Sequence, residues 1–144
     1  MVLVEVSVEI SKPLDEVFSY VTNFAHAFAW RSTLMAITDT PQEAMRVGYT
    51  FREQSKLLDR VVSTIYEVVE WIPSRRFTYK SIVGIVSSLV CVRFEPTTRG
   101  TQVTMSVEQS FDLVFPQTET LAMRAAQRIL QVDVQTLKDI VEGR

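Results

Sequence analysis

Glu53 is the residue of this 144-residue chain with the clearest potential for chemistry. Phe51 precedes it by two positions in an alternating segment, and a tight turn at Leu58-Asp59 would bring Tyr66 of the next segment to the same face. A carboxylate among aromatic side chains has a raised pKa, so Glu53 could act as a general base or anchor a ligand hydroxyl. Alternatively, Glu53 lies near the rim of the sheet, hydrated or paired with an arginine.

Four other polar side chains interrupt apolar surfaces. Tyr66 and Tyr79 face inward in their alternating segments, where their hydroxyl groups could meet a ligand or lie at the edge of an ordinary core. Gln109 and Ser88 interrupt the inward apolar rows of two neighbouring segments. Because burial of an amide without a hydrogen bond is costly, Gln109 requires a protein partner, a water or a ligand. These side chains are therefore candidates for the polar part of a binding site.

The only histidine, His26, does not belong to a catalytic or metal-binding motif. It lies in a short apolar segment, away from any predicted acid partner or nucleophile. A metal site would need several clustered Cys, His, Asp or Glu ligands, and the four scattered glycines form no phosphate-binding loop. We expect no metal and no cofactor, and Glu53 is the leading candidate for a catalytic role.

Charge and hydropathy exclude several classes of protein. The formal net charge is −2, which does not favour binding to nucleic acid. No segment approaches the ~20 apolar residues of a transmembrane helix, and the N-terminus lacks the basic and apolar regions of a signal peptide. The single cysteine permits no intrachain disulfide, in agreement with a reducing compartment. We expect a cytoplasmic protein that contains no integral membrane segment.

The alternation of apolar and polar residues predicts the elements that would position these side chains. Residues 2–10 alternate as a half-buried strand, and residues 11–30 change to the spacing of two short helices. About six further strands follow between residues 34 and 111. Pairing across the hairpin loop at 96–100 aligns the inward rows that contain Ser88 and Gln109. Consecutive hairpins predict one antiparallel sheet.

The C-terminal stretch from Gln117 to Glu142 contains no glycine or proline and predicts a helix about 40 Å long. Polar residues, among them Asp133, cover most of its surface. The first half of its apolar face is rich in alanine, which indicates loose packing there. The apolar stripe consists of Met123, Ala126, Leu130, Val134, Leu137 and Val141.

The order and spacing of several short motifs resemble those of the START/Bet v 1-like (SRPBCC) superfamily, in particular its polyketide cyclase/dehydrase and lipid transport group. The resemblance covers nearly the whole chain. Many relatives have an aspartate where this chain has Asn23. The motifs, in chain order, are Ile10-Ser11-Lys12-Pro13, Glu16-Val17-Phe18-Ser19-Tyr20-Val21-Thr22-Asn23, Trp30, Val47-Gly48, Glu70-Trp71-Ile72-Pro73-Ser74-Arg75-Arg76-Phe77 and Gly100-Thr101-Gln102-Val103-Thr104.

The resemblance implies one domain, residues 1–144, with an α+β helix-grip fold. In that fold a curved antiparallel sheet of about seven strands wraps around the long C-terminal helix, and two short helices follow the first strand. A cavity between sheet and helix holds lipids, sterols, polyketides, hormones or quinones in different members. The family has no universal catalytic signature, so the resemblance assigns no catalytic role to a residue here.

Three functions remain open. The first is a carrier or sensor that binds a hydrophobic small molecule, such as a lipid or polyketide, between sheet and helix. The second is a cyclase or dehydratase in which Glu53 or a tyrosine transfers a proton in the same cavity. The third is an interaction module that dimerises through the outward residues Ile85, Leu89 and Cys91. The predicted ligand-binding residues are Phe51, Glu53, Tyr66, Tyr79, Val90, Met105, Gln109, Ala122, Ala126 and Leu130.

Overall fold

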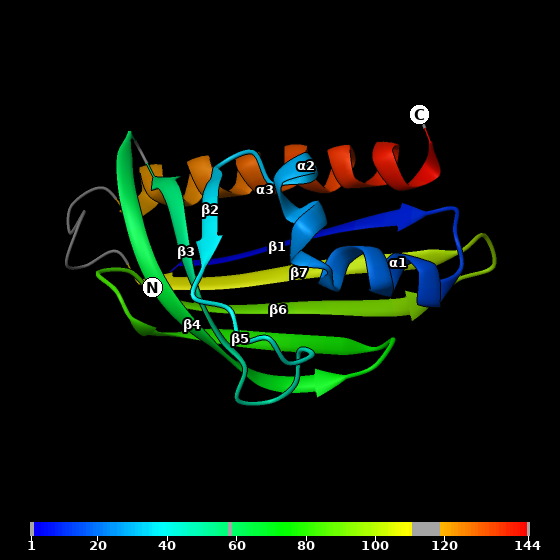
Figure 1. Cartoon of the computed structure of the whole chain (residues 1–144). Helices are drawn as coiled ribbons and strands as arrows, with labels where there is room; N and C mark the ends of the chain where they lie inside the picture. The colour runs from blue at the N-terminus through cyan, green and yellow to red at the C-terminus, as the bar shows by residue number, and fades with distance from the viewer. Residues whose placement is uncertain (1, 58, 111–118, 144) are drawn as a thin grey trace.

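The structure, a computed structural model, describes residues 2–57, 59–110 and 119–143. It has one strand, three short helical segments in a row, six more strands and one long helix (Figure 1). Leu58 of the predicted turn and residues 117–118 of the predicted helix lie outside the described residues. The elements are β1 (Val2–Ile10), α1 (Leu14–Thr22), the 3-10 helix η1 (Phe24–His26), α2 (Ala27–Trp30), β2 (Leu34–Thr38), β3 (Thr50–Leu57), β4 (Arg60–Ile72), β5 (Arg76–Val83), β6 (Ser87–Pro96), β7 (Thr101–Ser110) and α3 (Glu119–Glu142).

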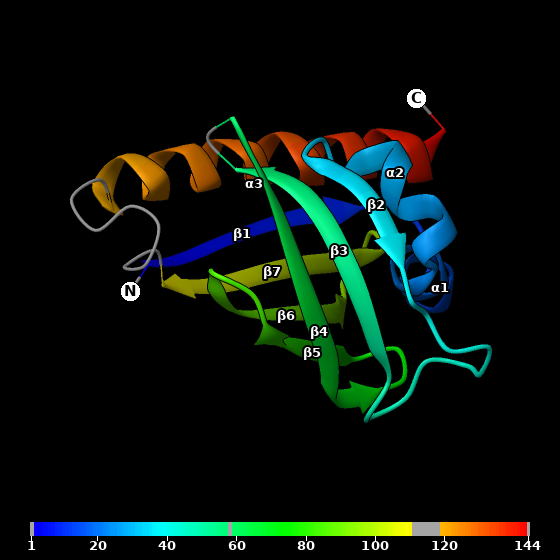
Figure 2. The same ribbon diagram turned by 60° about the vertical axis from the view of Figure 1, so that its left-hand side comes forward.

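The seven strands form one antiparallel sheet in the order β1-β7-β6-β5-β4-β3-β2. The first strand therefore pairs with the last one, and the helices between β1 and β2 bridge the two edges of the sheet. Figure 2 shows how the sheet curls, so that β3 and β4 cross in front of β1 and β7, while α3 runs along the top, above β1. The predicted α+β helix-grip fold is confirmed.

The predicted strand registers are confirmed where they matter for the site. Phe51 pairs with Tyr66 and Glu53 pairs with Thr64 between β3 and β4. Ser88 pairs with Gln109 between β6 and β7. Because side chains alternate between the two faces of a strand, these pairs fix which residues face α3.

The buried stripe of α3 differs from the predicted stripe at two positions. Ala122, Val134 and Leu137 are buried as the spacing of an amphipathic helix requires, but Met123 is 40% exposed. Met123 follows Ala122 by one residue, which is about 100° around the helix and away from the sheet. Asp133, predicted on the polar surface, is only 5% exposed. The core-facing stripe thus contains a carboxylate.

Two separate hydrophobic clusters lie under α3. The larger one contains the aromatic side chains of the sheet and the last turns of α3, including Val134 and Leu137. The smaller one, near the first turns of α3, gathers around Ala122. Leu130 packs against both clusters. The helix therefore rests on the sheet at two places.

The last turn of α3 is tied to the end of β1. The Lys138 Nζ donates to the Glu9 carbonyl oxygen at 2.6 Å and to the Glu142 carboxylate at 2.8 Å. The same Glu142 carboxylate accepts a hydrogen bond from the Ser11 backbone N–H at 2.7 Å. These bonds fix the direction in which α3 crosses the sheet.

Prediction. Leu137→Ala should lower the free energy of unfolding by about 2–5 kcal/mol, because it removes a fully buried side chain from the larger cluster. Met123→Ala on the same helix should cost less than about 1 kcal/mol, because Met123 is exposed. Urea denaturation of both variants checks this. Equal losses would contradict the assigned face of α3.

Candidate functional site

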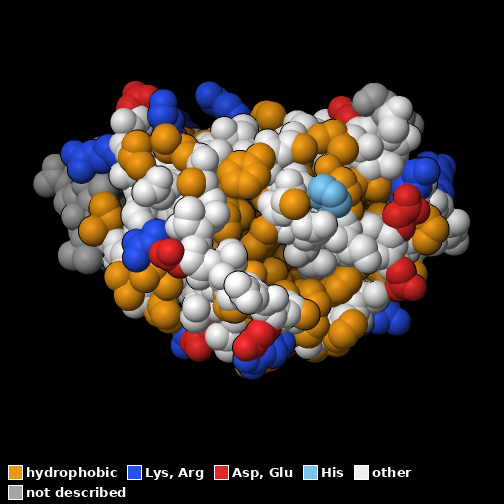
Figure 3. Space-filling view, viewed as in Figure 1, with side chains coloured by type: hydrophobic (Ala, Val, Ile, Leu, Met, Phe, Trp, Pro, Cys, Tyr) orange, Lys and Arg blue, Asp and Glu red, His pale blue; other side chains and the backbone are white. Residues whose placement is uncertain are grey.

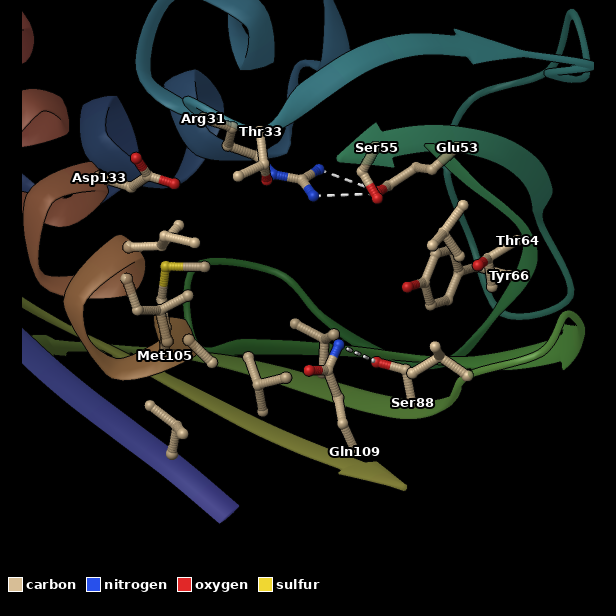
Figure 4. Close-up of a pocket in the computed structure, with 18 of the residues that line it drawn as sticks. Arg31, Thr33, Glu53, Ser55, Thr64, Tyr66, Ser88, Met105, Gln109 and Asp133 are labelled. Atoms are coloured by element: carbon tan, nitrogen blue, oxygen red, sulfur yellow. Dashed lines mark hydrogen bonds and ion pairs between the residues drawn. The ribbon is translucent and has the colours of Figure 1, made fainter. Parts of the chain in front are cut away.

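A cavity of about 140 Å³ lies between the sheet and α3. Figure 4 shows its walls: strands of the curled sheet below and to one side, α3 opposite, and the segment after α2 at the top. Residues of both hydrophobic clusters line it, including Val62 of the smaller and Val90 of the larger one. The cavity is thus the gap between the two places where α3 rests on the sheet.

Most of the residues predicted for the site line this cavity. Phe51 does not, because the rings of Phe24, Tyr66 and Tyr79 surround it at centroid distances of 4.7, 5.5 and 5.4 Å. Ala122 does not either, because it is fully buried in the smaller cluster. That the lining residues bind a ligand stays a prediction. Those that line the cavity are Glu53, Tyr66, Tyr79, Val90, Met105, Gln109, Ala126 and Leu130.

Glu53 forms an ion pair with Arg31, in which the Glu53 side chain is buried and the Arg31 side chain is 20% exposed. The Arg31 Nη1 and Nη2 each donate to a different carboxylate oxygen of Glu53 at 2.9 Å (Figure 4). Glu53 is 3% exposed and lies in the middle of β3, so it is not a hydrated residue at the rim. The structure thus has the arginine partner of the second interpretation, without the position at the rim that this interpretation included. This bidentate arrangement is the strongest one between a guanidinium group and a carboxylate.

Arg31 keeps its charge in this environment. Burial alone would lower the pKa of Arg31, but the negative charge of Glu53 and the hydrogen bonds to it raise that pKa above its ordinary value. Sequence reasoning missed Arg31, which directly follows α2 and has no periodic pattern around it. Only the turn after α2 and its contact with β3 bring the cation to Glu53.

The two tyrosines next to the pair remain protonated at neutral pH. Burial, with a further contribution from the charge of Glu53, raises the pKa of Tyr66 to about 12. Burial also raises the pKa of Tyr79, although the nearby Arg31 opposes this. The two rings meet edge to face at 5.1 Å. Each hydroxyl group can therefore both donate and accept a hydrogen bond.

Gln109 is half-buried and has a protein partner. Its Nε2 donates to the Ser88 hydroxyl at 3.3 Å across the β6–β7 pair (Figure 4). Ser88 in turn donates its backbone N–H to the Ser81 hydroxyl at 2.9 Å. Both Gln109 and Ser88 line the cavity, so this polar pair is one part of its wall.

Asp133 is the second charged group that sequence reasoning missed. It lines the cavity from α3 and accepts a hydrogen bond from the Ser32 backbone N–H at 3.2 Å. Burial raises the pKa of Asp133, and the interactions with Ser32 and Arg31 only partly oppose this. Its spacing could have revealed it, because three residues after Leu130 and four before Leu137 is the core-facing side of the helix.

His26 and the acidic residues form no additional site. The His26 ring stacks on the Tyr20 ring at a centroid distance of 4.2 Å, near the surface between α1 and α2. Figure 3 shows this histidine beside hydrophobic side chains, with most charged groups toward the edge of that face. Among the described residues, no three His, Cys, Asp or Glu side chains are placed to hold a metal ion.

Comparisons with known proteins agree with this architecture. The family model described as polyketide cyclase / dehydrase and lipid transport matches residues 1–142. No curated protein matches the sequence. Over the described parts of the chain, no helix is long and apolar enough to cross a membrane.

Several solved structures have the same fold. TTHA0849 from Thermus thermophilus is 17% identical, with a TM-score of 0.74 over 98% of this chain and 94% of that one. DR_A0006 from Deinococcus radiodurans is 17% identical, with a TM-score of 0.73 over 99% of each chain. MLL2253 from Mesorhizobium loti is 20% identical, with a TM-score of 0.72 over 98% of this chain and 97% of that one. At these identities the likeness shows the fold alone.

Prediction. Arg31→Met should lower the free energy of unfolding by about 3–5 kcal/mol, because it leaves the buried Glu53 carboxylate unpaired. Glu53→Leu should cost less, because the Arg31 side chain is 20% exposed and can reach water. The double variant should lose less than Arg31→Met, because no buried, unpaired charge remains. Urea denaturation of the four proteins forms a double-mutant cycle. Additive losses would show that the two side chains do not depend on each other.

Prediction. Asp133→Asn should remove a pH dependence of stability. Because the pKa of Asp133 is higher in the folded than in the unfolded chain, the unfolded chain binds fewer protons between these pKa values. The wild-type protein should therefore lose stability relative to the variant as pH rises from about 4, the ordinary aspartate pKa, through the raised pKa. Urea denaturation at several pH values checks this.

The control for this measurement is Thr136→Val, on the same helix, which removes no titratable group. Its stability should differ from that of the wild-type protein by an amount that does not change with pH. A difference between wild-type and Asp133→Asn that is equally constant would contradict the burial of the Asp133 carboxylate.

Proposed function

This chain belongs to the polyketide cyclase / dehydrase and lipid transport family, and we propose that it is a carrier or sensor of a small hydrophobic molecule. The observation that carries the proposal is the cavity between the sheet and α3. Its walls combine apolar side chains, such as Val86, Val90 and Leu130, with a few polar groups next to Arg31. This combination is typical of pockets in which apolar contact drives binding and a few polar groups orient the ligand.

The size of the cavity favours a small ligand. Its volume is about 140 Å³, whereas pockets for drug-sized ligands have volumes of roughly 300–1,000 Å³. A dry engineered cavity of about 150 Å³ binds benzene. We therefore expect a ligand, or a part of a ligand between sheet and helix, of about the size of one ring. A long lipid chain or a folded polyketide is larger than this space.

The state of Glu53 favours a carrier or sensor over an enzyme. Both carboxylate oxygens of Glu53 accept hydrogen bonds from Arg31, so this residue is poorly suited to take a proton from a substrate. A cyclase or dehydratase that used this cavity would depend instead on Asp133 or on a tyrosine such as Tyr66. A carrier needs none of these groups to react, only to orient the ligand.

The other expectations from the sequence stay predictions. Ile85, in the turn between β5 and β6, is 50% exposed, Leu89 of β6 is 38% exposed and Cys91 is partly buried; these three residues remain the predicted homodimer contact. We infer a cytoplasmic location from the single cysteine, and no binding to nucleic acid from the net charge of −2.

Prediction. Ala126→Phe should weaken the binding of ethylbenzene at least tenfold while changing the free energy of unfolding by less than about 1 kcal/mol. Ala126 lines the cavity from α3, and a ring placed there occupies the space for the ligand without overpacking a filled core. Isothermal titration calorimetry and urea denaturation provide the two measurements.

The control is Arg128→Phe, which adds the same ring at an exposed position of α3. It should bind ethylbenzene as the wild-type protein does. If Ala126→Phe unfolds the protein, the cavity is not open at Ala126. If the wild-type protein binds no small apolar molecule at all, the proposed function is wrong.

A further inference from the structure

We infer that the ligand is an electrically neutral molecule of about single-ring size that presents an oxygen acceptor to the indole N–H of Trp30. This inference rests on the proposed ligand-binding function and adds the chemical class of the ligand. It depends on three features of the cavity wall: a buried donor without an acceptor, an arginine whose charge is already neutralised, and a buried carboxylate.

The donor is Trp30, the last residue of α2. Trp30 is 4% exposed and lines the cavity, yet its Nε1 has no hydrogen-bond acceptor among the described residues. An indole nitrogen can only donate, and leaving a buried donor without an acceptor is unfavourable. Such groups are uncommon in folded proteins and require an explanation. A ligand oxygen in the adjoining cavity supplies the missing acceptor.

The charges around the cavity select against an anionic ligand. The Arg31 cation is neutralised by Glu53 through two hydrogen bonds, so it attracts a further anion only weakly. Asp133 adds a carboxylate to the same wall, and burial already raises its pKa. Lys56 also lines the cavity, but it is exposed, so water and salt screen its charge. Among the described residues that line the cavity, the cations are Arg31 and the exposed Lys56, and Arg31 is already paired with Glu53.

The cavity wall offers hydrogen-bond donors to an uncharged oxygen atom of a ligand. Glu53 uses two of the five N–H groups of Arg31, and Tyr66 and Tyr79 add hydroxyl groups to the wall. Trp30, Arg31 and Tyr79 also line a second, smaller cavity of about 20 Å³, so they form a shared wall between the two spaces. A cavity of that size can hold one water molecule, which is the competing partner for the Trp30 donor.

Three probes of similar size separate these possibilities. Acetophenone has a ring and a neutral carbonyl oxygen, ethylbenzene has the ring without the oxygen, and benzoate has the ring with a negative charge. Isothermal titration calorimetry should give acetophenone an affinity about tenfold higher than that of ethylbenzene, which corresponds to one well-formed hydrogen bond. Benzoate should bind more weakly than both.

The Trp30→Phe variant tests the assigned donor. It should bind acetophenone and ethylbenzene with equal affinity, because the ring contact remains while the N–H is lost. Trp30 is part of the larger hydrophobic cluster, so this variant could be unstable. A measurement on a protein that keeps Trp30 is therefore needed as well.

That measurement uses the only other tryptophan, Trp71, as the matched control. Trp71 contacts the rings of Phe18 and Phe77 and does not line the cavity. In the Trp71→Phe variant, the one remaining indole N–H resonance in a ¹H–¹⁵N spectrum is that of Trp30. Acetophenone should move this resonance downfield as the hydrogen bond forms, and ethylbenzene should not.

The outcomes are distinct. If acetophenone and ethylbenzene bind equally to the wild-type protein and the Trp30 resonance does not move downfield, the donor has another partner, such as a water, and the inference is wrong while the proposed function stands. If benzoate binds most tightly, the inference of a neutral ligand is wrong. If none of the three binds, the proposed function itself fails.

Discussion

The ion pair between the partly exposed Arg31 and the buried Glu53 is the interaction on which the site depends. Two charges that leave water are tolerated only if each meets the other with good geometry, and both oxygens of Glu53 do so at 2.9 Å. Arg31 directly follows α2, whereas Glu53 lies in β3. The pair therefore attaches the short helices to the curled end of the sheet. The adjacent Ser32 donates its N–H to Asp133, which attaches the same segment to α3.

These attachments explain how a cavity can persist inside a small domain. Apolar side chains in protein interiors normally pack until no space remains. Here α3 is supported at two hydrophobic clusters, and its last turn is tied to β1 through Lys138 and Glu142. Between the clusters the helix presents the small side chain of Ala126, and the opposite wall contains polar groups that cannot move into an apolar core without losing their partners.

The sequence predicted the fold well because the fold follows from local patterns. Alternation and hairpin geometry predicted the register that places Glu53 beside Phe51 and Tyr66, and the glycine-free C-terminal stretch predicted α3. The local sequence pattern did not predict the environment of residues whose position depends on tertiary contacts. Arg31 lies in a turn, where no periodic pattern surrounds it. The polar side chain of Asp133 predicts a surface position unless its spacing from Leu137 is considered. Met123 appeared to continue an apolar stripe that in the structure passes through Ala122 instead.

The central claim is that a small apolar molecule binds between α3 and the sheet, next to the ion pair. The most direct measurement is a crystal structure of the wild-type protein soaked with bromobenzene, in which anomalous scattering locates the bromine atom. The account predicts one strong bromine peak in the cavity lined by Met105, Ala126 and Leu130. A cavity without bromine, or bromine bound only on the outer face of the sheet, would contradict it.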